Sequence, residues 1–129
     1  MFQSSDIAKL ILRLSVGIMM LFHGIEKIIN GINGVKHLTV KAGLPEFFAY
    51  GVYIGEVIVP IFIILGLYAR VASLFLALNM IMAIFLAYGS SFLSLGKYGA
   101  PIIELPLFYF ILSIVIFLLG SGRYAVNSK

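Results

Sequence analysis

Four long apolar stretches, separated by short polar segments, run through the chain and predict four membrane-spanning helices. Their expected bounds are about residues 8–29, 46–67, 72–92 and 101–120. Each stretch holds about 20 residues, and at about 1.5 Å per residue such a helix matches a bilayer's hydrocarbon core, about 30 Å thick. The predicted fold is therefore all-α, a four-helix transmembrane bundle that forms a single membrane domain over residues 1–129.

The segment between the first two predicted spans is short and amphipathic. Its apolar and basic positions fall on opposite sides of a helical wheel, with Val35, Leu38 and Ala42 against Lys36, His37 and Lys41. Such a pattern favours one or two helical turns lying on the membrane surface. An irregular loop is an equally good interpretation of so short a stretch.

The composition confirms that lipid must solvate much of the chain. Hydrophobic residues make up 62% and charged residues 11%, with a mean hydropathy of +1.13, whereas a soluble domain is about 25% charged. The chain has no cysteine, which excludes disulfides, thiol chemistry and iron–sulfur ligation within it. The net charge of +4 comes from basic residues scattered singly at helix ends. It therefore indicates snorkelling side chains and no nucleic-acid partner.

An even number of spans places both termini on one side of the membrane, and the basic residues indicate which side. With a cytoplasmic N-terminus the inside set is slightly larger than the outside set: Lys9, Arg13, Arg70, Arg123 and Lys129 against Lys27, Lys36, Lys41 and Lys97. This small excess favours cytoplasmic termini. Residues 1–9 are short and polar, so we expect a retained first span and no cleaved secretory leader.

The first span carries ionisable residues that are costly at membrane depth, where such groups turn inward or mark a functional path. A narrow stripe along one face of this helix contains Arg13, Gly17, Met20, Gly24 and Lys27. His23 borders the stripe, and Glu26 lies further round. Because small residues let helices approach closely, we predict that four glycines line the contact between the first two spans: Gly17, Gly24, Gly51 and Gly55.

Glu56 lies near the middle of the second span, the costliest depth for a charge. Pro60 follows four residues later and removes the hydrogen bond that the Glu56 carbonyl would accept in a regular helix. By expected depth, Arg13 lies too near the inner face and Lys27 too near the outer face to pair with this carboxyl group. We therefore expect Glu56 to face the first span near His23.

Two interpretations of these polar residues compete. In the structural one, Glu56 is protonated or hydrogen-bonded to a neighbouring helix, while His23 and Glu104 are reached by water. In the functional one, they form a pocket for a polar headgroup or a proton relay. Glu104 taken alone suits a helix start, where a negative charge is favoured. His23 and Glu26, three residues apart, supply too few ligands for a metal site.

The order of residues along the first three spans resembles that of the DoxX family. The matching pieces are Leu12-Arg13-Leu14, Gly17, Phe22-His23-Gly24, Lys27, Gly43-Leu44-Pro45, Ala49-Tyr50, Glu56, Gly66-Leu67 and Arg70. The resemblance covers roughly residues 10–87. The fourth span matches only in its length and in Gly120-Ser121-Gly122-Arg123-Tyr124.

The resemblance implies a small four-helix bundle in the cytoplasmic membrane of a bacterium or archaeon. Family members are associated with membrane redox systems, including a relative in thiosulfate:quinone oxidoreductase and members linked to quinones, catechols or oxidative-stress defence. Carried over residue by residue, the implied functional positions are Arg13, His23, Lys27, Glu56 and Arg70. The absence of cysteine argues against sulfur transfer by a thiol of this chain.

The leading hypothesis is an accessory membrane subunit of a quinone-linked redox system, with no intrinsic cofactor and a membrane quinone in its apolar bundle. Its candidate catalytic residues are Glu56 and His23, and its candidate ligand-binding residues are Arg13, Lys27, Glu26, Glu104 and Arg70. A redox protein would supply the electrons, and a homo-oligomer is left open. A non-catalytic membrane scaffold and a small transporter component are the alternatives, and the residues do not decide whether the chain is an enzyme.

Overall fold

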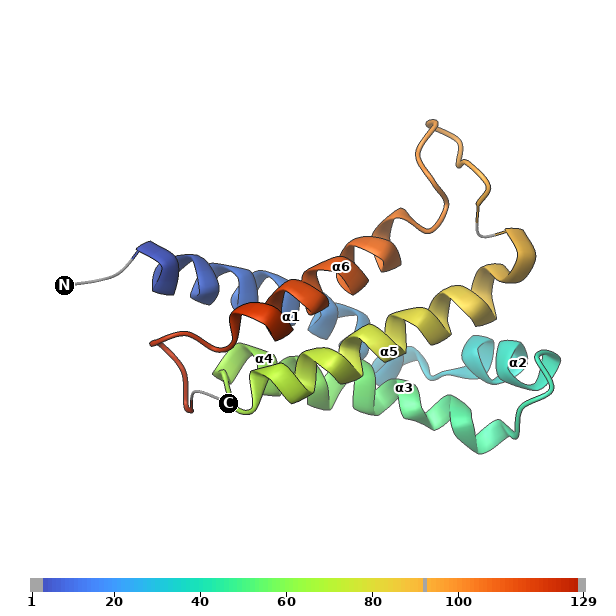
Figure 1. Ribbon diagram of the computed structural model, residues 1–129. Coiled ribbons are helices and arrows are strands. Elements are labelled where there is room, and N and C mark those ends of the chain that lie inside the picture. The colour runs from blue at the N-terminus through green and yellow to red at the C-terminus, as the bar shows by residue number, and fades with distance from the viewer. Residues whose placement is uncertain (1–3, 92, 128–129) are drawn as a thin grey trace.

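The computed structural model describes residues 4–91 and 93–127, and every regular element in that part of the chain is a helix (Figure 1). Helix α1 spans Ser4–Asn30, and the short α2 spans Asn33–Lys41. The second apolar stretch forms one continuous helical rod over Glu46–Leu65, which we call the second rod. Helices α5, Ala69–Tyr88, and α6, Glu104–Leu119, complete the bundle. The prediction of an all-α fold is confirmed.

The second rod changes its helical pitch along its length. It begins with the 3₁₀ segment Glu46–Tyr50 and the single α-turn α3, Gly51–Tyr53. A π-helical turn, Ile54–Ile58, follows, in which the Val59 N–H donates to the Ile54 carbonyl five residues back. The rod ends with α4, Val59–Leu65. Because Pro60 has no N–H to offer, the wider turn falls where a regular helix cannot close its hydrogen bonds.

The long helical segments run alternately in opposite directions (Figure 1). The start of α1 and residues 120–127 meet at one end, which we call the terminal end. There the Arg123 N–H donates to Asp6 Oδ1 over 3.2 Å, and the Val126 N–H donates to the Leu65 carbonyl over 3.0 Å. Helix α2 lies at the opposite end of the bundle, called here the α2 end (Figure 1).

Within the described residues, three helices are long and apolar enough to cross a membrane: Ser4–Asn30, Glu46–Leu65 and Ala69–Ser91. Helix α6 is also apolar but has 16 residues, about 24 Å at 1.5 Å per residue. Four crossings therefore remain a prediction. Helix α5, which corresponds to the predicted span 72–92, begins at Ala69, three residues before the predicted start. The predicted last residue, Phe92, lies outside the described residues.

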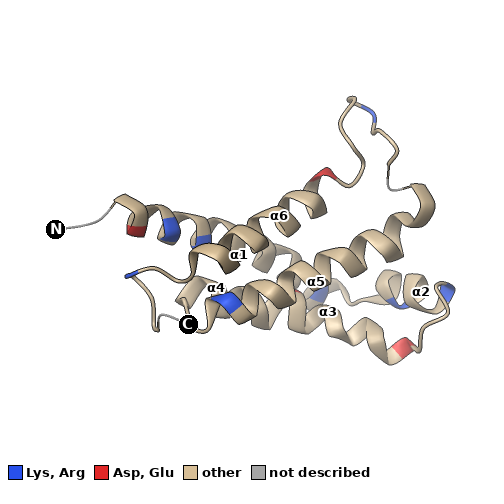
Figure 2. Cartoon of the chain, in the orientation of Figure 1, with Lys and Arg blue, Asp and Glu red and all other residues tan. Residues whose placement is uncertain are grey.

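The outer surface of the bundle suits lipid. Large apolar side chains point outward along the helices, among them Phe22, Leu78 and Leu118, which are 65%, 62% and 70% exposed. Figure 2 shows the charged residues gathered towards the ends and loops, with long uncharged stretches between them. So much continuous apolar surface is rare on soluble monomers and indicates a membrane environment.

Arg13 is buried at the terminal end, with 2% of its surface exposed. Its guanidinium donates hydrogen bonds to four backbone carbonyls, those of Ile63, Ile64, Ser121 and Tyr124, over 2.7–3.0 Å. None of these four carbonyl partners of Arg13 was predicted from the sequence. Two of these carbonyls lie in the last turn of the second rod and two in residues 120–127 after α6, and the planar fork of arginine can bond to several of them at once.

The glycine prediction is half right. Gly17 and Gly24 do lie where α1 crosses the second rod, since a Cβ would stand 2.5 Å from Ile64 Cγ1 at Gly17 and 2.8 Å from Val57 Cγ2 at Gly24. Gly55 instead faces α5, where a Cβ would stand 2.5 Å from Asn79 Cγ. Gly51 meets nothing within 4 Å. Successive helical residues point about 100° apart, so Glu56 facing α1 turns Gly55 towards α5.

Candidate functional site

A cavity of about 370 Å³ lies inside the bundle, between its middle and the α2 end. It is bounded by α1, α2, the second rod, α5 and α6. Most of its walls are apolar. Its ionisable and amide side chains are His23, Lys27, Glu56, Asn79 and Tyr109.

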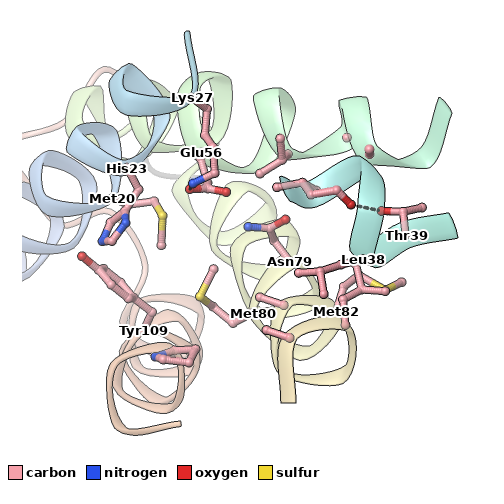
Figure 3. A pocket seen from close by; sticks show the side chains of 18 of the residues that line it. Met20, His23, Lys27, Leu38, Thr39, Glu56, Asn79, Met80, Met82 and Tyr109 are labelled. Atoms are coloured by element: carbon pink, nitrogen blue, oxygen red, sulfur yellow. Dashed lines mark hydrogen bonds and ion pairs between the residues drawn. The ribbon is translucent and has the colours of Figure 1, made fainter. Parts of the chain in front are cut away.

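Glu56 pairs with Lys27 at the wall where α1 crosses the second rod (Figure 3). The Lys27 Nζ lies 3.4 Å from Glu56 Oε1, and both side chains are largely shielded, with 21% and 10% exposed. Gly24 makes this pairing possible, because α1 approaches the Glu56 backbone so closely that any Cβ at Gly24 would collide with the Glu56 carbonyl.

The expectation that depth would separate Lys27 from Glu56 was wrong. Lys27 follows Gly24 by three residues and so shares its face of α1. A lysine side chain also carries its charge several ångströms from its Cα, along an apolar stem that can lie within the bundle. His23 does line the same cavity, but the partner of the Glu56 carboxyl group is Lys27.

The Lys27 ammonium also lies 3.4 Å from Glu26 Oε2, so two carboxyl groups share one lysine. The Glu26 side chain is 54% exposed, whereas that of Glu56 is 10% exposed. With both carboxyl groups ionised and His23 neutral, this cluster carries one net negative charge. It also connects the outer surface of α1 with the buried wall of the cavity.

Three further cavity side chains have polar atoms without a hydrogen-bonding partner among residues 4–91 and 93–127. They are the His23 imidazole, the Asn79 amide and the Tyr109 hydroxyl. The His23 and Tyr109 rings meet edge to face, with centroids 5.9 Å apart and planes at 86°. Polar groups that face an apolar cavity in this way are available to a ligand.

Asn79 and Tyr109 were not among the candidates predicted from the sequence. Asn79 stands out only as the single carboxamide of an otherwise apolar span. Tyr109 is the one tyrosine of α6, but the sequence does not show which way its hydroxyl group points. Its position depends on how α6 meets α1, which a single sequence does not specify.

The other predicted site residues lie elsewhere. Glu104 opens α6 as expected, but it is exposed and does not line the cavity. Arg70 lies in the first turn of α5 at the terminal end, where its guanidinium borders Gly120. Arg13 is at the same end, held by carbonyls. The structure therefore gathers Glu56, His23, Lys27 and Glu26, and separates them from Arg13, Arg70 and Glu104.

Helix α2 covers the cavity at the α2 end, which supports the helical interpretation of this segment. Val35, Leu38 and Thr39 line the cavity, and the Thr39 hydroxyl is satisfied by the Val35 carbonyl over 2.7 Å. Lys36 connects α2 to the second rod through two contacts. Its Nζ lies 3.8 Å from Glu46 Oε1 and 4.9 Å from the centre of the Tyr50 ring. Tyr50 raises the pKa of Lys36 above its ordinary value by hydrogen bonding.

No group of three or more His, Asp or Glu side chains in the described part of the chain comes close enough to hold a metal ion. The site consists of one buried ion pair and a few hydrogen-bonding groups in an apolar cavity. Such an arrangement can orient a small oxygen-bearing molecule and exchange protons with it.

Comparison with known proteins supports the family assignment. The family model DoxX matches residues 8–89. The chain belongs to the DoxX family. This DoxX match takes in α1, the second rod and α5, and so includes His23, Lys27, Glu56 and Asn79, while Tyr109 lies beyond it. The family and the three apolar helices identify the chain as a membrane protein.

One curated relative of this DoxX chain is a Bacillus subtilis (strain 168) protein named "Putative oxidoreductase CatD". The two are 34% identical over 82 residues, which is 64% of this chain and 60% of that protein. The chain thus matches less than two thirds of the relative's length. No solved structure matches the chain significantly.

Proposed function

We propose that the chain is a membrane subunit of a redox system whose cavity binds the oxygenated ring of a quinone or diphenol. The observation that carries this proposal is the buried Lys27–Glu56 pair beside unpartnered His23, Asn79 and Tyr109 groups in an otherwise apolar cavity. The name of the Bacillus subtilis relative, "Putative oxidoreductase CatD", supports the redox assignment.

The residues of the cavity fit such a ring. Its volume, about 370 Å³, lies in the range of about 300–1,000 Å³ that is usual for small-molecule sites. A quinone has an apolar ring and two carbonyl acceptors. Donors for these acceptors come from the Lys27 ammonium, the Tyr109 hydroxyl and the Asn79 amide.

A bound quinone supplies the redox chemistry, since it takes up two electrons and two protons to become the diphenol. Glu56 and His23 can each hold a proton and pass it to an oxygen within hydrogen-bonding reach. Lys27 compensates the charge of Glu56 while that group is ionised. Glu26, at the exposed edge of the cluster, links these groups to the outer surface. The two electrons come from a partner redox protein.

A binding experiment with a matched tyrosine control tests the proposal. Purified protein in lipid nanodiscs is titrated with duroquinone, and protein-free discs correct for uptake by the lipid. Tyr109→Phe removes one hydroxyl in the cavity, so we expect about 3- to 10-fold weaker binding, corresponding to a hydrogen bond of about 1 kcal/mol. Tyr98 is 90% exposed outside the cavity, and Tyr98→Phe should bind like the parent.

The absence of specific binding by the folded parent protein would overturn the proposal and favour the scaffold alternative. Equal affinities of the Tyr109→Phe and Tyr98→Phe variants would contradict the placement of the ring beside Tyr109. Proton-coupled uptake of another solute into vesicles, without quinone binding, would instead favour the transporter alternative with Glu56 as its coupling group.

A further inference from the structure

Four basic side chains gather at the terminal end, and none of them pairs with an acidic side chain in the described part of the chain. They are Lys9 and Arg13 on α1, Arg70 in the first turn of α5, and Arg123 after α6. From this unbalanced charge we propose that the terminal end binds the phosphate of an anionic phospholipid. This site is separate from the cavity, and the proposal does not depend on what the cavity binds.

The charge of the terminal end is strongly positive. Figure 2 shows basic residues gathered there on α1, on α5 and on the segment after α6. The ion pairs among residues 4–91 and 93–127 all involve Lys27 or Lys36, which lie away from this end. The acidic side chain present here, Asp6, accepts the Arg123 backbone N–H over 3.2 Å. One carboxylate therefore faces four basic side chains, and most of their charge is left uncompensated.

Two of these basic side chains pack against the short segment that follows α6. Gly120 and Gly122 both have φ +81°. A Cβ at Gly120 would stand 2.8 Å from Arg70 Nη2, and a Cβ at Gly122 would stand 3.1 Å from Lys9 Cδ. Two residues of chain span at most about 7 Å, and Arg123 comes directly after Gly122. Basic side chains from three parts of the sequence therefore converge, which suits an oxyanion with several acceptor oxygens.

Arg13 adds a buried positive charge behind this surface. Its guanidinium donates to four backbone carbonyls, which satisfy its N–H groups but carry no opposite charge. A buried charge without an opposite charge is costly. One of the four carbonyls belongs to Ser121, which lies between Gly120 and Gly122. A phosphate bound at this segment would therefore lie near the Arg13 charge and reduce that cost.

The surroundings of these side chains favour a phospholipid over a free phosphate ion. Lys9, Arg70 and Arg123 lie within two turns of the ends of lipid-facing helices, at the expected level of lipid headgroups. Large apolar side chains adjoin them: Leu74, one turn after Arg70 on α5, is 40% exposed, and Leu118, near the end of α6, is 70% exposed. The predicted topology places this end at the cytoplasmic leaflet, where anionic lipids attract basic side chains.

Lipid binding measured by native mass spectrometry tests the proposal. The purified protein in mild detergent is titrated with palmitoyl-oleoyl phosphatidylglycerol, or with phosphatidylcholine that carries the same acyl chains and no net charge. Each basic side chain near an anionic lipid surface strengthens binding about 5-fold. We therefore expect the first phosphatidylglycerol to bind roughly 10-fold or more tightly than phosphatidylcholine. Glycerol phosphate, which has no acyl chains, should not displace it even in large excess.

Variants that remove one charge at either end of the bundle locate the site. Lys9→Gln and Arg70→Gln should each weaken phosphatidylglycerol binding about 5-fold and leave phosphatidylcholine binding unchanged. Lys41→Gln removes the same charge from an exposed position at the α2 end and should bind both lipids like the parent. Because Arg70 packs against Gly120, Arg123→Gln takes its place if Arg70→Gln fails to fold by circular dichroism.

Three results would overturn the proposal. Equal affinities of the parent for the two lipids would exclude recognition of the anionic headgroup. An equal loss of phosphatidylglycerol binding in Lys41→Gln and Lys9→Gln would mean that affinity follows net charge and no defined site. Displacement of phosphatidylglycerol by glycerol phosphate would assign the site to a free phosphate compound in place of a lipid. A preference that is lost only in the terminal-end variants would support the proposal.

Discussion

Gly24 is the position where a single methyl group should disturb both the fold and the site. In Gly24→Ala, the new Cβ would overlap the Glu56 carbonyl oxygen and stand 2.6 Å from the Glu56 carbonyl carbon and 2.8 Å from Val57 Cγ2. Carbon atoms in ordinary contact are about 3.5–4.0 Å apart. Because the obstacle includes backbone atoms, α1 must move away from the second rod by roughly 1 Å.

The expected cost follows from two opposing effects. Overpacking a well-filled contact costs about 1–3 kcal/mol, and here the upper part of that range applies because the backbone cannot rotate away. Replacing glycine by alanine inside a helix stabilises the folded state by about 1 kcal/mol. We therefore expect a net loss of about 1–2 kcal/mol in the free energy of unfolding, together with a Lys27–Glu56 distance beyond its present 3.4 Å.

Thermal unfolding in mild detergent, followed by circular dichroism, measures this effect against Gly51→Ala. Gly51 has ordinary helical angles (φ −59°, ψ −22°), and its added Cβ would meet nothing within 4 Å. The control should therefore unfold at the parent's temperature or slightly above it, and Gly24→Ala several degrees below. If both variants unfold like the parent, the close crossing of α1 and the second rod is wrong.

The remaining predictions concern other parts of the account. Arg13→Lys should lower the free energy of unfolding by about 1–3 kcal/mol, because an ammonium cannot reach all four carbonyls; a melting temperature like the parent's would refute this. Glu56→Gln should keep the fold but reduce quinone-dependent activity of membranes to the level of cells lacking the protein, whereas Glu104→Gln, altered outside the cavity, should retain it; full activity in the first variant would exclude Glu56 as a proton carrier. Reporter fusions after Lys129 and within residues 35–42 should report opposite sides of the membrane, with Lys129 cytoplasmic, and reports of the same side would contradict the topology.

The helices were predictable because their signal is local. Long apolar runs broken by Asn, Gly and Pro specify where helices begin and end to within a few residues, and the glycine stripe of α1 correctly indicated a close crossing. Pro60 marks the position of the π-helical turn in the sequence, because it has no N–H to donate to the Glu56 carbonyl. The sequence does not show that a π-helical turn replaces the regular one there, because the choice depends on packing against neighbouring helices.

The candidate site was predicted in part. Glu56 and His23 were found from the cost of burying polar groups, a property of each residue and its depth. The Lys27–Glu56 pair was missed because depth was measured at the backbone, without the reach of the lysine side chain. Asn79 and Tyr109 were missed because their place in the cavity depends on the packing of α5 and α6 against α1.

Photoaffinity labelling tests most directly the central claim that a quinone ring binds between α1, the second rod and α6. An azido-substituted benzoquinone with a decyl chain is activated by light in nanodiscs containing the parent protein, and the modified residues are identified by mass spectrometry. Labelling should concentrate on the side chains around Glu56, namely Met20, His23, Met80 and Tyr109, and should disappear with excess unlabelled decyl quinone. Labelling spread over outward-facing residues such as Phe22 and Leu78, without competition, would contradict the account.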